Sequence, residues 1–295
     1  MQERFLSSSR GDQETKLRPR EMYPGLGLQS NRSFANAHLT EDSDTTIQHW
    51  AIYKSRYEDW QSYFGLEATL AVYSHPDISL NQTTSAIVWV VYGQGGPADQ
   101  FNAIHVGWTV NPQLYADTRA RFFTFWTADG FQNKGCYDLR CEGFHLLNGA
   151  VIAPGDVIDP VSTGKGTTSD ITFRIFKDET SGDWWLYYGQ EDNNISPVGY
   201  FPKTLFGGLA ESSTGIDFGG YVDFEKGGVG PPMGNGRYPG EDDAAYFKGV
   251  QYISRHGEGY LPTQLRDYVN NKDCYQVGNF DFGKFYYGGP SGCTN

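Results

Sequence analysis

Three observations in the sequence predict an all-β protein built as an antiparallel sandwich or barrel. Aromatic residues make up 16% of the 295 residues and 37 residues are glycine, a composition that favours strands joined by tight turns. Short alternating or apolar runs follow one another, each bounded by Gly, Pro, Asp or Asn. Helix signals between these runs are few, so the strands are expected to pair with one another in an antiparallel sense.

The chain divides into a polar arm and one domain. Residues 1–44 are rich in Ser, Arg, Asp and Gly and have no hydrophobic period, which predicts a partly irregular N-terminal arm. No linker composition interrupts residues 45–295, so we expect them to form a single domain.

The expected strands follow in order along that domain. "LEATLAVY" (66–73) alternates between apolar and polar residues, whereas "AIVWVVY" (86–92) is apolar throughout and suits a strand buried on both faces. The later runs are "NAIHVGWTV" (102–110), "RFFTFWT" (121–127), "ITFRIF" (171–176), "WWLYYG" (184–189), "GIDFGGYVDF" (215–224), "YFKGVQYI" (246–253) and "GKFYYGG" (283–289). Short helices are expected only within residues 58–64 and 202–210.

One histidine stands out in the run 102–110. Period two places the large apolar side chains on one face of this strand, namely Ile104, Val106, Trp108 and Val110. His105 then stands on the other face, between the small residues Ala103 and Gly107. An imidazole with small neighbours on a sheet is a candidate functional group, although a hydrogen-bonded structural histidine is the commoner case.

The run 215–224 has a similar polar face. Period two separates an apolar set, Ile216, Phe218, Gly220, Val222 and Phe224, from a polar set, Asp217, Gly219, Tyr221 and Asp223. We take Asp217, Asp223, Gly107 and Gly219 as candidate substrate-binding residues. Small residues beside polar groups suit a substrate groove, and they suit a closely packed neighbouring strand equally well.

Charge and hydropathy exclude several classes of partner. The net charge of −12 would repel a polyanion, so we expect no nucleic-acid partner. No apolar run reaches the length needed to cross a bilayer, and the first thirty residues contain no apolar core of a signal peptide. The sequence leaves the oligomeric state open.

The cysteines and sequons indicate an oxidising, secretory compartment. Cys136 and Cys141 form one local pair and Cys274 and Cys293 another, which suggests two disulfides that close small loops. Glycosylation sequons begin at Asn31, Asn81 and Asn194.

Motifs for cofactor or metal chemistry are not evident in the sequence. No glycine-rich loop has phosphate-binding spacing, and neither G-x-S-x-G nor H-E-x-x-H occurs. The six histidines do not pair at metal-ligand spacing. We therefore expect neither a cofactor nor a metal.

Several blocks in order carry a family resemblance. They are "HVGWTVNPQLYADTRARFFTFWTADGFQNKGCYDLRCEGF", "VGYFPKTLF", "FGGYV", "GPPMGNGRYPGEDDAAYFKGVQYI" and "CYQVGNFDFGKFYYGGPSGC". From about residue 49 to 295 the chain resembles the neprosin family, secreted glutamic peptidases best known for cleaving after proline. The resemblance implies a two-sheet β-sandwich of the jelly-roll or concanavalin-like kind, with a groove across one sheet. It also implies secretion and the disulfides Cys136–Cys141 and Cys274–Cys293.

The resemblance assigns two catalytic glutamates to positions where this chain has none. The family pattern I-E-A-G-W corresponds here to residues 104–108, with His105 in place of the glutamate, and W-G-G-E-V corresponds to residues 218–222, with Tyr221 in place of the other. In the family the two glutamates face each other, and one activates water while the other protonates the amide. We expect that mechanism to be lost here.

Three functions remain open from the sequence. The first is a repurposed enzyme, in which His105 and Tyr221 act on a small, aromatic-stacking substrate by acid–base or orienting chemistry such as isomerisation, elimination or cyclisation. The second is a pseudopeptidase whose groove only binds a peptide or glycan. The third is a peptidase that uses Asp217 or Asp223. We favour the first, because both replacements can form hydrogen bonds and handle protons.

Overall fold

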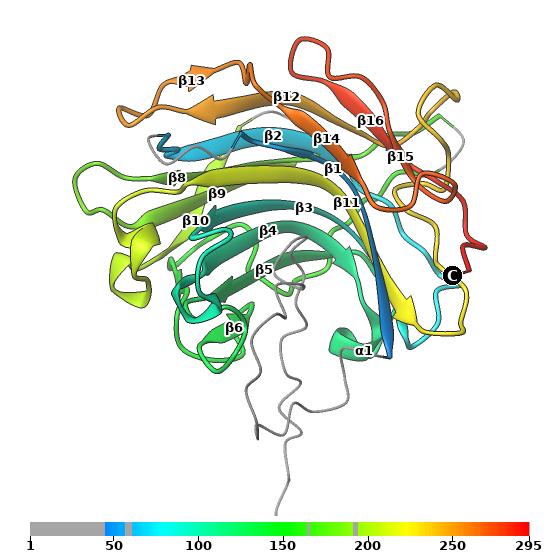
Figure 1. Ribbon diagram of the computed structural model, residues 1–295, viewed down its shortest axis with the longest axis horizontal. Helices are drawn as coiled ribbons and strands as arrows, with labels where there is room; N and C mark the ends of the chain where they lie inside the picture. The colour runs from blue at the N-terminus through cyan, green and yellow to red at the C-terminus, as the bar shows by residue number, and fades with distance from the viewer. Residues whose placement is uncertain (1–44, 57–60, 164–165, 191–193, 295) are drawn as a thin grey trace, which may run out of the picture.

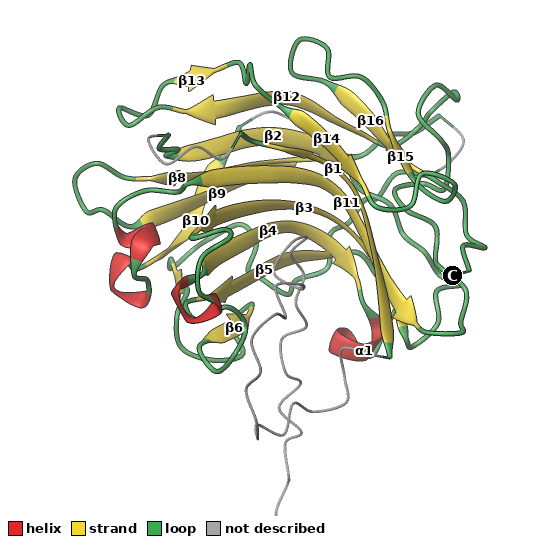
Figure 2. Cartoon of the chain, viewed as in Figure 1, coloured by secondary structure: helices red, strands yellow, loops and turns green. Residues whose placement is uncertain are grey.

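The computed structural model describes residues 45–56, 61–163, 166–190 and 194–294 (Figure 1). These residues form two antiparallel sheets with very little helix, as Figure 2 shows, so the all-β sandwich predicted from the sequence is confirmed. The predicted arm, residues 1–44, and the sequon at Asn31 lie outside the described residues. In the part of the chain that the structure describes, no helix has the length and apolarity to span a bilayer.

The first sheet has seven strands. Their spatial order is β14 (Arg266–Val269), β1 (Thr46–Lys54), β11 (Gly215–Glu225), β3 (Gln82–Tyr92), β4 (Asn102–Val110), β5 (Arg121–Thr127) and β6 (Gly135–Tyr137). Each neighbouring pair is antiparallel, and the central strands β11, β3 and β4 pair along most of their length. The candidate residues all lie on β4 and β11, so this sheet positions the site.

The second sheet has nine strands and packs against the first. Its order is β15 (Gln276–Val277), β16 (Phe285–Gly288), β12 (Tyr246–Ile253), β2 (Gly65–Ala71), β8 (Asp170–Lys177), β9 (Trp184–Gln190), β10 (Ser196–Phe201) and β7 (His145–Leu146), with β13 (Gly259–Tyr260) paired to β12.

Helical turns are short and occur in connections. Asn111 caps α1 (Pro112–Tyr115) by accepting a hydrogen bond from the Leu114 N–H, and Pro112 suits the first helical position. The helix expected within 202–210 is instead two separate turns, η2 (Lys203–Leu205) and η3 (Gly208–Ala210), because adjacent glycines at 207 and 208 interrupt it. A further turn, η1, spans Ala98–Gln100. Of the other expected helix, residues 57–60 lie outside the described residues and residues 61–64 are not helical.

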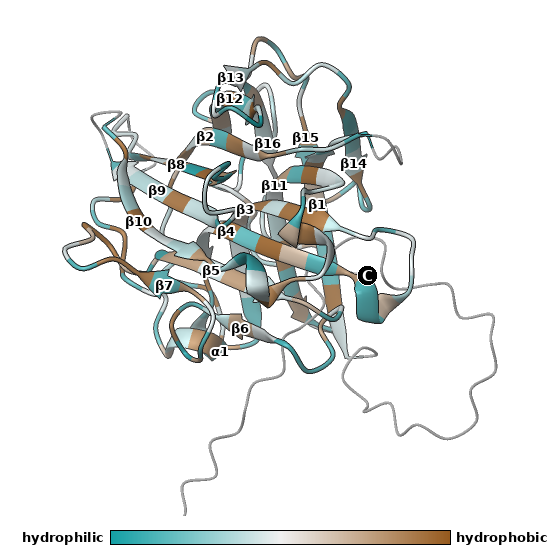
Figure 3. Ribbon diagram, turned by 90° about the vertical axis from the view of Figure 1, so that its left-hand side faces the viewer, coloured by the Kyte–Doolittle hydropathy of each residue, from teal (hydrophilic) through white to brown (hydrophobic). Residues whose placement is uncertain are grey.

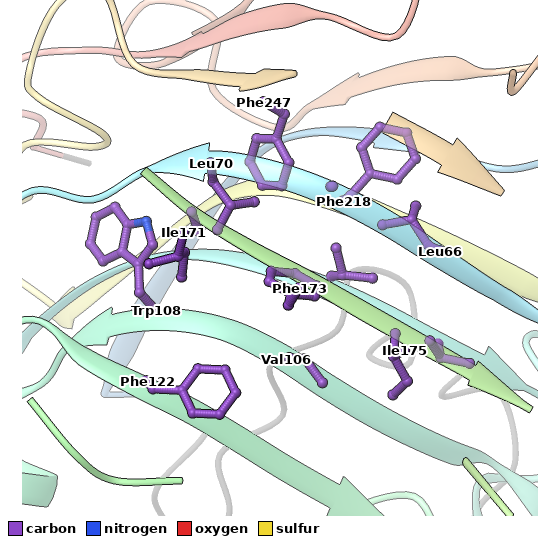
Figure 4. Packing of buried hydrophobic residues seen from close by; sticks show 14 of the residues in the cluster. Leu66, Leu70, Val106, Trp108, Phe122, Ile171, Phe173, Ile175, Phe218 and Phe247 are labelled. Carbon is purple, nitrogen blue, oxygen red and sulfur yellow. The ribbon is translucent and has the colours of Figure 1, made fainter. Parts of the chain in front are cut away.

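The main core lies between the two sheets. Figure 4 shows Val106 and Trp108 of β4 facing Ile171 and Phe173 of β8, and all four side chains are fully buried. The Trp108 indole N–H also donates to the Ala71 carbonyl across the core, at 3.1 Å. Burial of such side chains contributes roughly 1.5–3 kcal/mol each, which makes this layer the main source of stability.

The alternation predicted for the two candidate strands is confirmed. Figure 3 shows hydrophobic and hydrophilic bands along strands of the seven-stranded sheet such as β4. The sets predicted as apolar faces enter the core between the sheets, among them Ile104, Trp108, Ile216 and Phe218. His105 and Tyr221 therefore stand on the opposite face of the same sheet.

Both predicted disulfides are present. Cys136 of β6 is bonded to Cys141 in the following loop, and Cys274 is bonded to Cys293 near the C-terminus. No free cysteine remains, since all four are paired. The pairs close loops of short sequence separation, 5 and 19 residues, as the local spacing suggested.

Candidate functional site

A second group of buried apolar side chains covers the face of the seven-stranded sheet that points away from the other sheet. We call it the aromatic face. It consists of Trp50, Ile52, Ile87, Trp89, Val91, Phe101, Ala103, Leu114, Phe123, Phe125, Phe131 and Tyr221. Both positions at which the family resemblance places a glutamate, 105 and 221, lie within it.

His105 is enclosed by aromatic rings. Trp89 of β3 and Phe125 of β5 are its direct partners in the sheet register, and their ring centroids lie 6.1 and 5.2 Å from that of the imidazole. Phe131, from the loop after β5, is 6.0 Å away. The face expected to be lined by small residues is therefore filled by large rings from the neighbouring strands and from one loop.

The imidazole of His105 is fully buried, and among the residues that the structure describes neither Nδ1 nor Nε2 has a hydrogen-bond partner. Burial disfavours the charged form and lowers the pKa of His105 to about 3. The ring is therefore neutral at physiological pH, with one nitrogen as a donor and the other as an acceptor. At this pKa the imidazole is a weak base, but it can still donate one hydrogen bond and accept another.

The two candidate glycines have a packing role. A Cβ at Gly107 would lie 2.0 Å from the Ala86 carbonyl oxygen of β3. At Gly219, with φ of +150°, a Cβ would lie 2.5 Å from the Ala51 carbonyl oxygen of β1. Of the two alternatives that the sequence left open, a substrate groove and a closely packed neighbouring strand, these contacts support the second, because the adjacent strand backbones occupy the space where the side chains would be.

Asp217 lies in the same transverse row of the sheet as His105, with Trp89 between them. Its side chain is fully buried and lies beside the end of β1, where Asp217 is opposite Lys54 in the register. The Ser55 N–H donates to Oδ1 at 3.2 Å, and the Lys54 ammonium is 3.8 Å from Oδ2. Asp217 is thus a structural ion-pair member in the described residues.

Tyr221 and Asp223 form a second polar group on this face. The Tyr221 hydroxyl donates to Asp223 Oδ2 at 2.9 Å, and both side chains are buried. The Tyr221 ring packs against Trp50, with centroids 5.7 Å apart. The phenol is thereby fixed in orientation by one hydrogen bond and one ring contact.

The structure brings His105 and Tyr221 onto one face but not into contact. The register aligns His105 with Asp217, and Tyr221 lies four residues further along β11, level with Ser85 and Thr109. On a flat sheet this offset corresponds to about 16 Å between the two Cα atoms. A molecule that touched both side chains would have to extend diagonally across β3.

The two candidate aspartates cannot form a carboxylate pair. Asp217 and Asp223 are six residues apart on one strand, a separation of about 20 Å. Two carboxylates that share a proton must lie within a few ångströms of each other. A peptidase mechanism based on Asp217 together with Asp223 is therefore excluded by geometry.

A third polar cluster at the edge of the aromatic face was not predicted from the sequence. The Tyr115 hydroxyl donates to Asp138 Oδ2 at 2.6 Å, and the Thr124 N–H donates to Oδ1 at 3.0 Å. Burial raises the pKa of Asp138 to about 6, against these hydrogen bonds and nearby Arg140. Asp138 lies inside the short disulfide loop, where no strand period applies, so the sequence pattern carries no signal for it.

Other predicted features have plain surroundings. Asn81 is exposed and its amide donates to Glu225, and Asn194 is exposed as well, so glycosylation at both stays a prediction. Within the described ranges, no three His, Cys, Asp or Glu side chains come together as a metal site.

Comparison with known proteins relates the chain to one protein family. The Neprosin family model matches residues 80–290. Similar solved structures include scytalido-glutamic peptidase with a transition state analog inhibitor (TM-score 0.46), the same peptidase with a peptide-based transition state analog (0.44), and SCP-B of the eqolisin family of peptidases with the tripeptide Ala-Ile-His (0.41). Each is 11% identical in sequence to this chain, and the match covers 83% of this chain and 100% of the similar structure.

Proposed function

Since the chain belongs to the Neprosin family, we propose that it retains the family's sheet face as a binding surface and acts there on a neutral, apolar small molecule instead of a peptide. The proposed chemistry is isomerisation, elimination or cyclisation, promoted by orientation of the substrate. One observation carries the proposal: a fully buried, neutral imidazole, with no hydrogen-bond partner among the described residues, stands among aromatic rings at a position to which the family resemblance assigns a glutamate.

The carboxylate geometry argues against peptide hydrolysis by the family mechanism. That mechanism needs two close carboxyl groups with different pKa values. The corresponding positions hold His105 and Tyr221, and the two aspartates on the same strand are too far apart to replace the pair.

The electrostatics of His105 favour an orienting role over proton abstraction. A base with a pKa of about 3 takes a proton weakly at neutral pH, whereas its N–H still donates a hydrogen bond at full strength. Surrounding rings from Trp89 and Phe125 offer flat apolar contacts. Together they suit a flat substrate that carries a neutral oxygen, such as a carbonyl or hydroxyl group.

Access to the imidazole requires one covering ring to move. Trp89 and Phe125 are fixed in paired strands, whereas Phe131 belongs to a loop and has a left-handed backbone, with φ of +65°. The Phe131 side chain is therefore the covering ring that can be displaced without breaking strand pairing. A ligand in its place would meet the imidazole edge directly.

A binding experiment with a simple probe tests the proposal. The probe is 2-naphthol, a neutral bicyclic molecule with one hydroxyl group, and naphthalene is its control without the hydroxyl. Binding is followed by calorimetry and by the ring ¹⁵N shifts of histidine-labelled protein. We expect 2-naphthol to bind and to shift the His105 nitrogens, and His105→Leu to weaken it roughly 2- to 12-fold, the range of one hydrogen bond, with naphthalene unaffected.

Three results would overturn the proposal. The first is the lack of 2-naphthol binding, and the second is an unchanged affinity in His105→Leu. The third is stronger binding of the anion 2-naphthoate than of 2-naphthol, since a neutral imidazole in apolar surroundings disfavours a buried charge. A binding-only protein differs from an enzyme in that bound substrate candidates are recovered unchanged.

A further inference from the structure

The two sulfurs of the disulfide Cys274–Cys293 differ in their exposure to solvent. The disulfide packs against the core between the sheets, whereas the aromatic face lies on the other side of the seven-stranded sheet. Cys293 is buried, with 6% of its surface exposed, and Cys274 is only partly buried. Cys274 is therefore the more accessible of the two residues to a thiol in solution.

Two hydrogen-bond donors contact the sulfur of the buried cysteine. The Asn271 side-chain amide donates to Cys293 Sγ at 3.6 Å, and His49 Nε2 lies 3.6 Å from the same atom. A disulfide sulfur carries no hydrogen, so the imidazole must be the donor in the second contact, with a hydrogen on Nε2. Both groups therefore direct an N–H toward Cys293 Sγ.

The fold fixes the positions of this imidazole and of the sulfur. His49 belongs to β1 and is buried, with the rings of Phe224 and Tyr275 at centroid distances of 5.7 and 5.6 Å. The Gly230 N–H donates to the Cys293 carbonyl oxygen at 2.7 Å, which holds the backbone of the cysteine. These contacts do not depend on the S–S bond, so they keep the donor beside the sulfur when that bond opens.

The other disulfide has a different polar environment. Cys136 Sγ lies 3.6 Å from the Tyr137 carbonyl oxygen, and Cys141 Sγ lies 3.8 Å from the Gly135 carbonyl oxygen. Carbonyl oxygens repel a negatively charged sulfur, whereas N–H groups stabilise it. In the part of the chain that the structure describes, the polar contacts therefore favour a thiolate at Cys293 over one at either sulfur of the other pair.

We propose that the disulfide Cys274–Cys293 is a thiol-exchange site that takes a small thiol of the glutathione class. The thiolate of the small molecule attacks Cys274 Sγ and forms a new S–S bond, while the bond between the two cysteines breaks. The electron pair of the broken bond stays on Cys293 Sγ, which becomes a thiolate and accepts the N–H groups of Asn271 and His49. One thiolate is consumed and one is released, so the step needs no further oxidant or reductant.

Both the access and the electrostatics support this direction of attack. Exchange requires an accessible sulfur for the incoming thiolate, which is Cys274, and it is faster when the leaving sulfur is stabilised as a thiolate, which is Cys293. The site is independent of the function proposed for the aromatic face.

Disulfide exchange in the folded protein at neutral pH tests this site. Reduction by dithiothreitol is followed by mass spectrometry after quenching with N-ethylmaleimide, and peptide mapping after reaction with glutathione identifies the attacked sulfur. We expect a rate proportional to the thiol concentration, with glutathione on Cys274 and N-ethylmaleimide on Cys293. Asn271→Ala and His49→Phe should each slow the reaction roughly 3- to 12-fold, since each removes one hydrogen bond to a sulfur that carries about half a negative charge in the transition state.

Asn279→Ala is the matched control, because it removes an exposed asparagine from the segment that the same disulfide closes. This variant should react at the rate of the original protein. A less stable fold would speed the reaction by exposing the disulfide, so slower exchange identifies the loss of a donor.

Three results would overturn the proposal. They are glutathione on Cys293 instead of Cys274, a rate that does not depend on the thiol concentration, and exchange in Asn271→Ala that is as fast as in the original protein or faster. Asn271 is only partly buried, so this variant decides the matter alone if the buried substitution His49→Phe prevents folding.

Discussion

Acid stability offers the most direct test of the environment of His105. Because the folded protein holds this imidazole with a pKa of about 3, against 6.5 in an unfolded chain, protons bind preferentially to the unfolded state as the pH falls. The stability associated with the neutral ring is complete above pH 6.5. It is lost progressively between pH 6.5 and pH 3.

The magnitude follows from the size of the shift. Between pH 7 and pH 4 the linkage relation gives a loss of about 3 kcal/mol for one fully buried group with these pKa values. His105→Leu, a substitution of similar volume, removes this titration while its own packing cost is independent of pH. The difference in unfolding free energy between pH 7 and pH 4 should therefore be about 3 kcal/mol smaller in His105→Leu than in the original protein.

Urea unfolding followed by tryptophan fluorescence at the two pH values measures this difference. Other buried groups titrate in both proteins and cancel in the comparison. Burial is the main cause that lowers the pKa of His75 to about 4, so this group also destabilises the folded protein as the pH falls. The pKa of Asp138 is raised to about 6, so its protonation stabilises the folded protein as the pH falls from 6 toward 4. His256→Leu is the matched control, since His256 is exposed and its side chain contacts Glu179 at the surface.

A parallel loss of stability in the original protein and in His105→Leu would refute the reasoning. It would mean that the imidazole is protonated as readily in the folded state as in the unfolded chain, so that it is neither dry nor without a partner. The proposed role as a neutral hydrogen-bonding group would then fail with it.

Four further predictions follow from the described contacts. The protein should leave a proline-containing peptide intact between about pH 2.5 and 5, as checked by mass spectrometry. Cleavage that is abolished by Asp217→Asn or Asp223→Asn would establish an aspartate-based peptidase. Gly107→Ala should lower the unfolding free energy by more than about 2 kcal/mol, because its Cβ would overlap the Ala86 carbonyl. In the control Gly207→Ala the new Cβ would lie 3.6 Å from Asn102 Oδ1, so the unfolding free energy should change by less than about 0.5 kcal/mol. Equal losses of unfolding free energy in the two variants would contradict the packing role of Gly107. Alkylation without reductant should label no cysteine, and Cys274→Ser with Cys293→Ser should cost about 3 kcal/mol in urea unfolding, so labelled thiols would count against the oxidised pairs. Tyr221→Phe should cost roughly 1–2 kcal/mol of stability through the lost hydrogen bond to Asp223, and a melting temperature equal to that of the original protein would show that this bond contributes little.

Sequence periodicity predicted well which side chains of β4 and β11 enter the core, because successive side chains of a strand point to opposite faces of the sheet. Ile104 and Trp108 on β4, and Ile216 and Phe218 on β11, occupy the core to which period two assigned them. Local spacing predicted the disulfides because short loops keep the paired cysteines close together. Cys136 and Cys141, for example, are separated by only 5 residues.

Contacts between strands could not be predicted in the same way. Period two places Ala103 and Gly107 beside His105, but it does not say which strands lie on either side of β4. The rings of Trp89 and Phe125 arrive from β3 and β5, and Phe131 arrives from a loop. The small residues therefore indicated a need for space, and only the register showed that neighbouring rings and backbones fill it.

The two positions to which the family resemblance assigns glutamates have different surroundings, and the difference bears on the proposed function. Tyr221 has a hydroxyl that donates to Asp223 and a ring that packs on Trp50, so the fold gives both parts of its side chain a structural use. His105 has ring neighbours, but its two buried nitrogens have no hydrogen-bond partner among the described residues. An unsatisfied buried polar group costs stability, and an apolar residue of the same size would remove that cost. A bound ligand would satisfy these nitrogens, which is why the function proposed for this sheet face rests on His105.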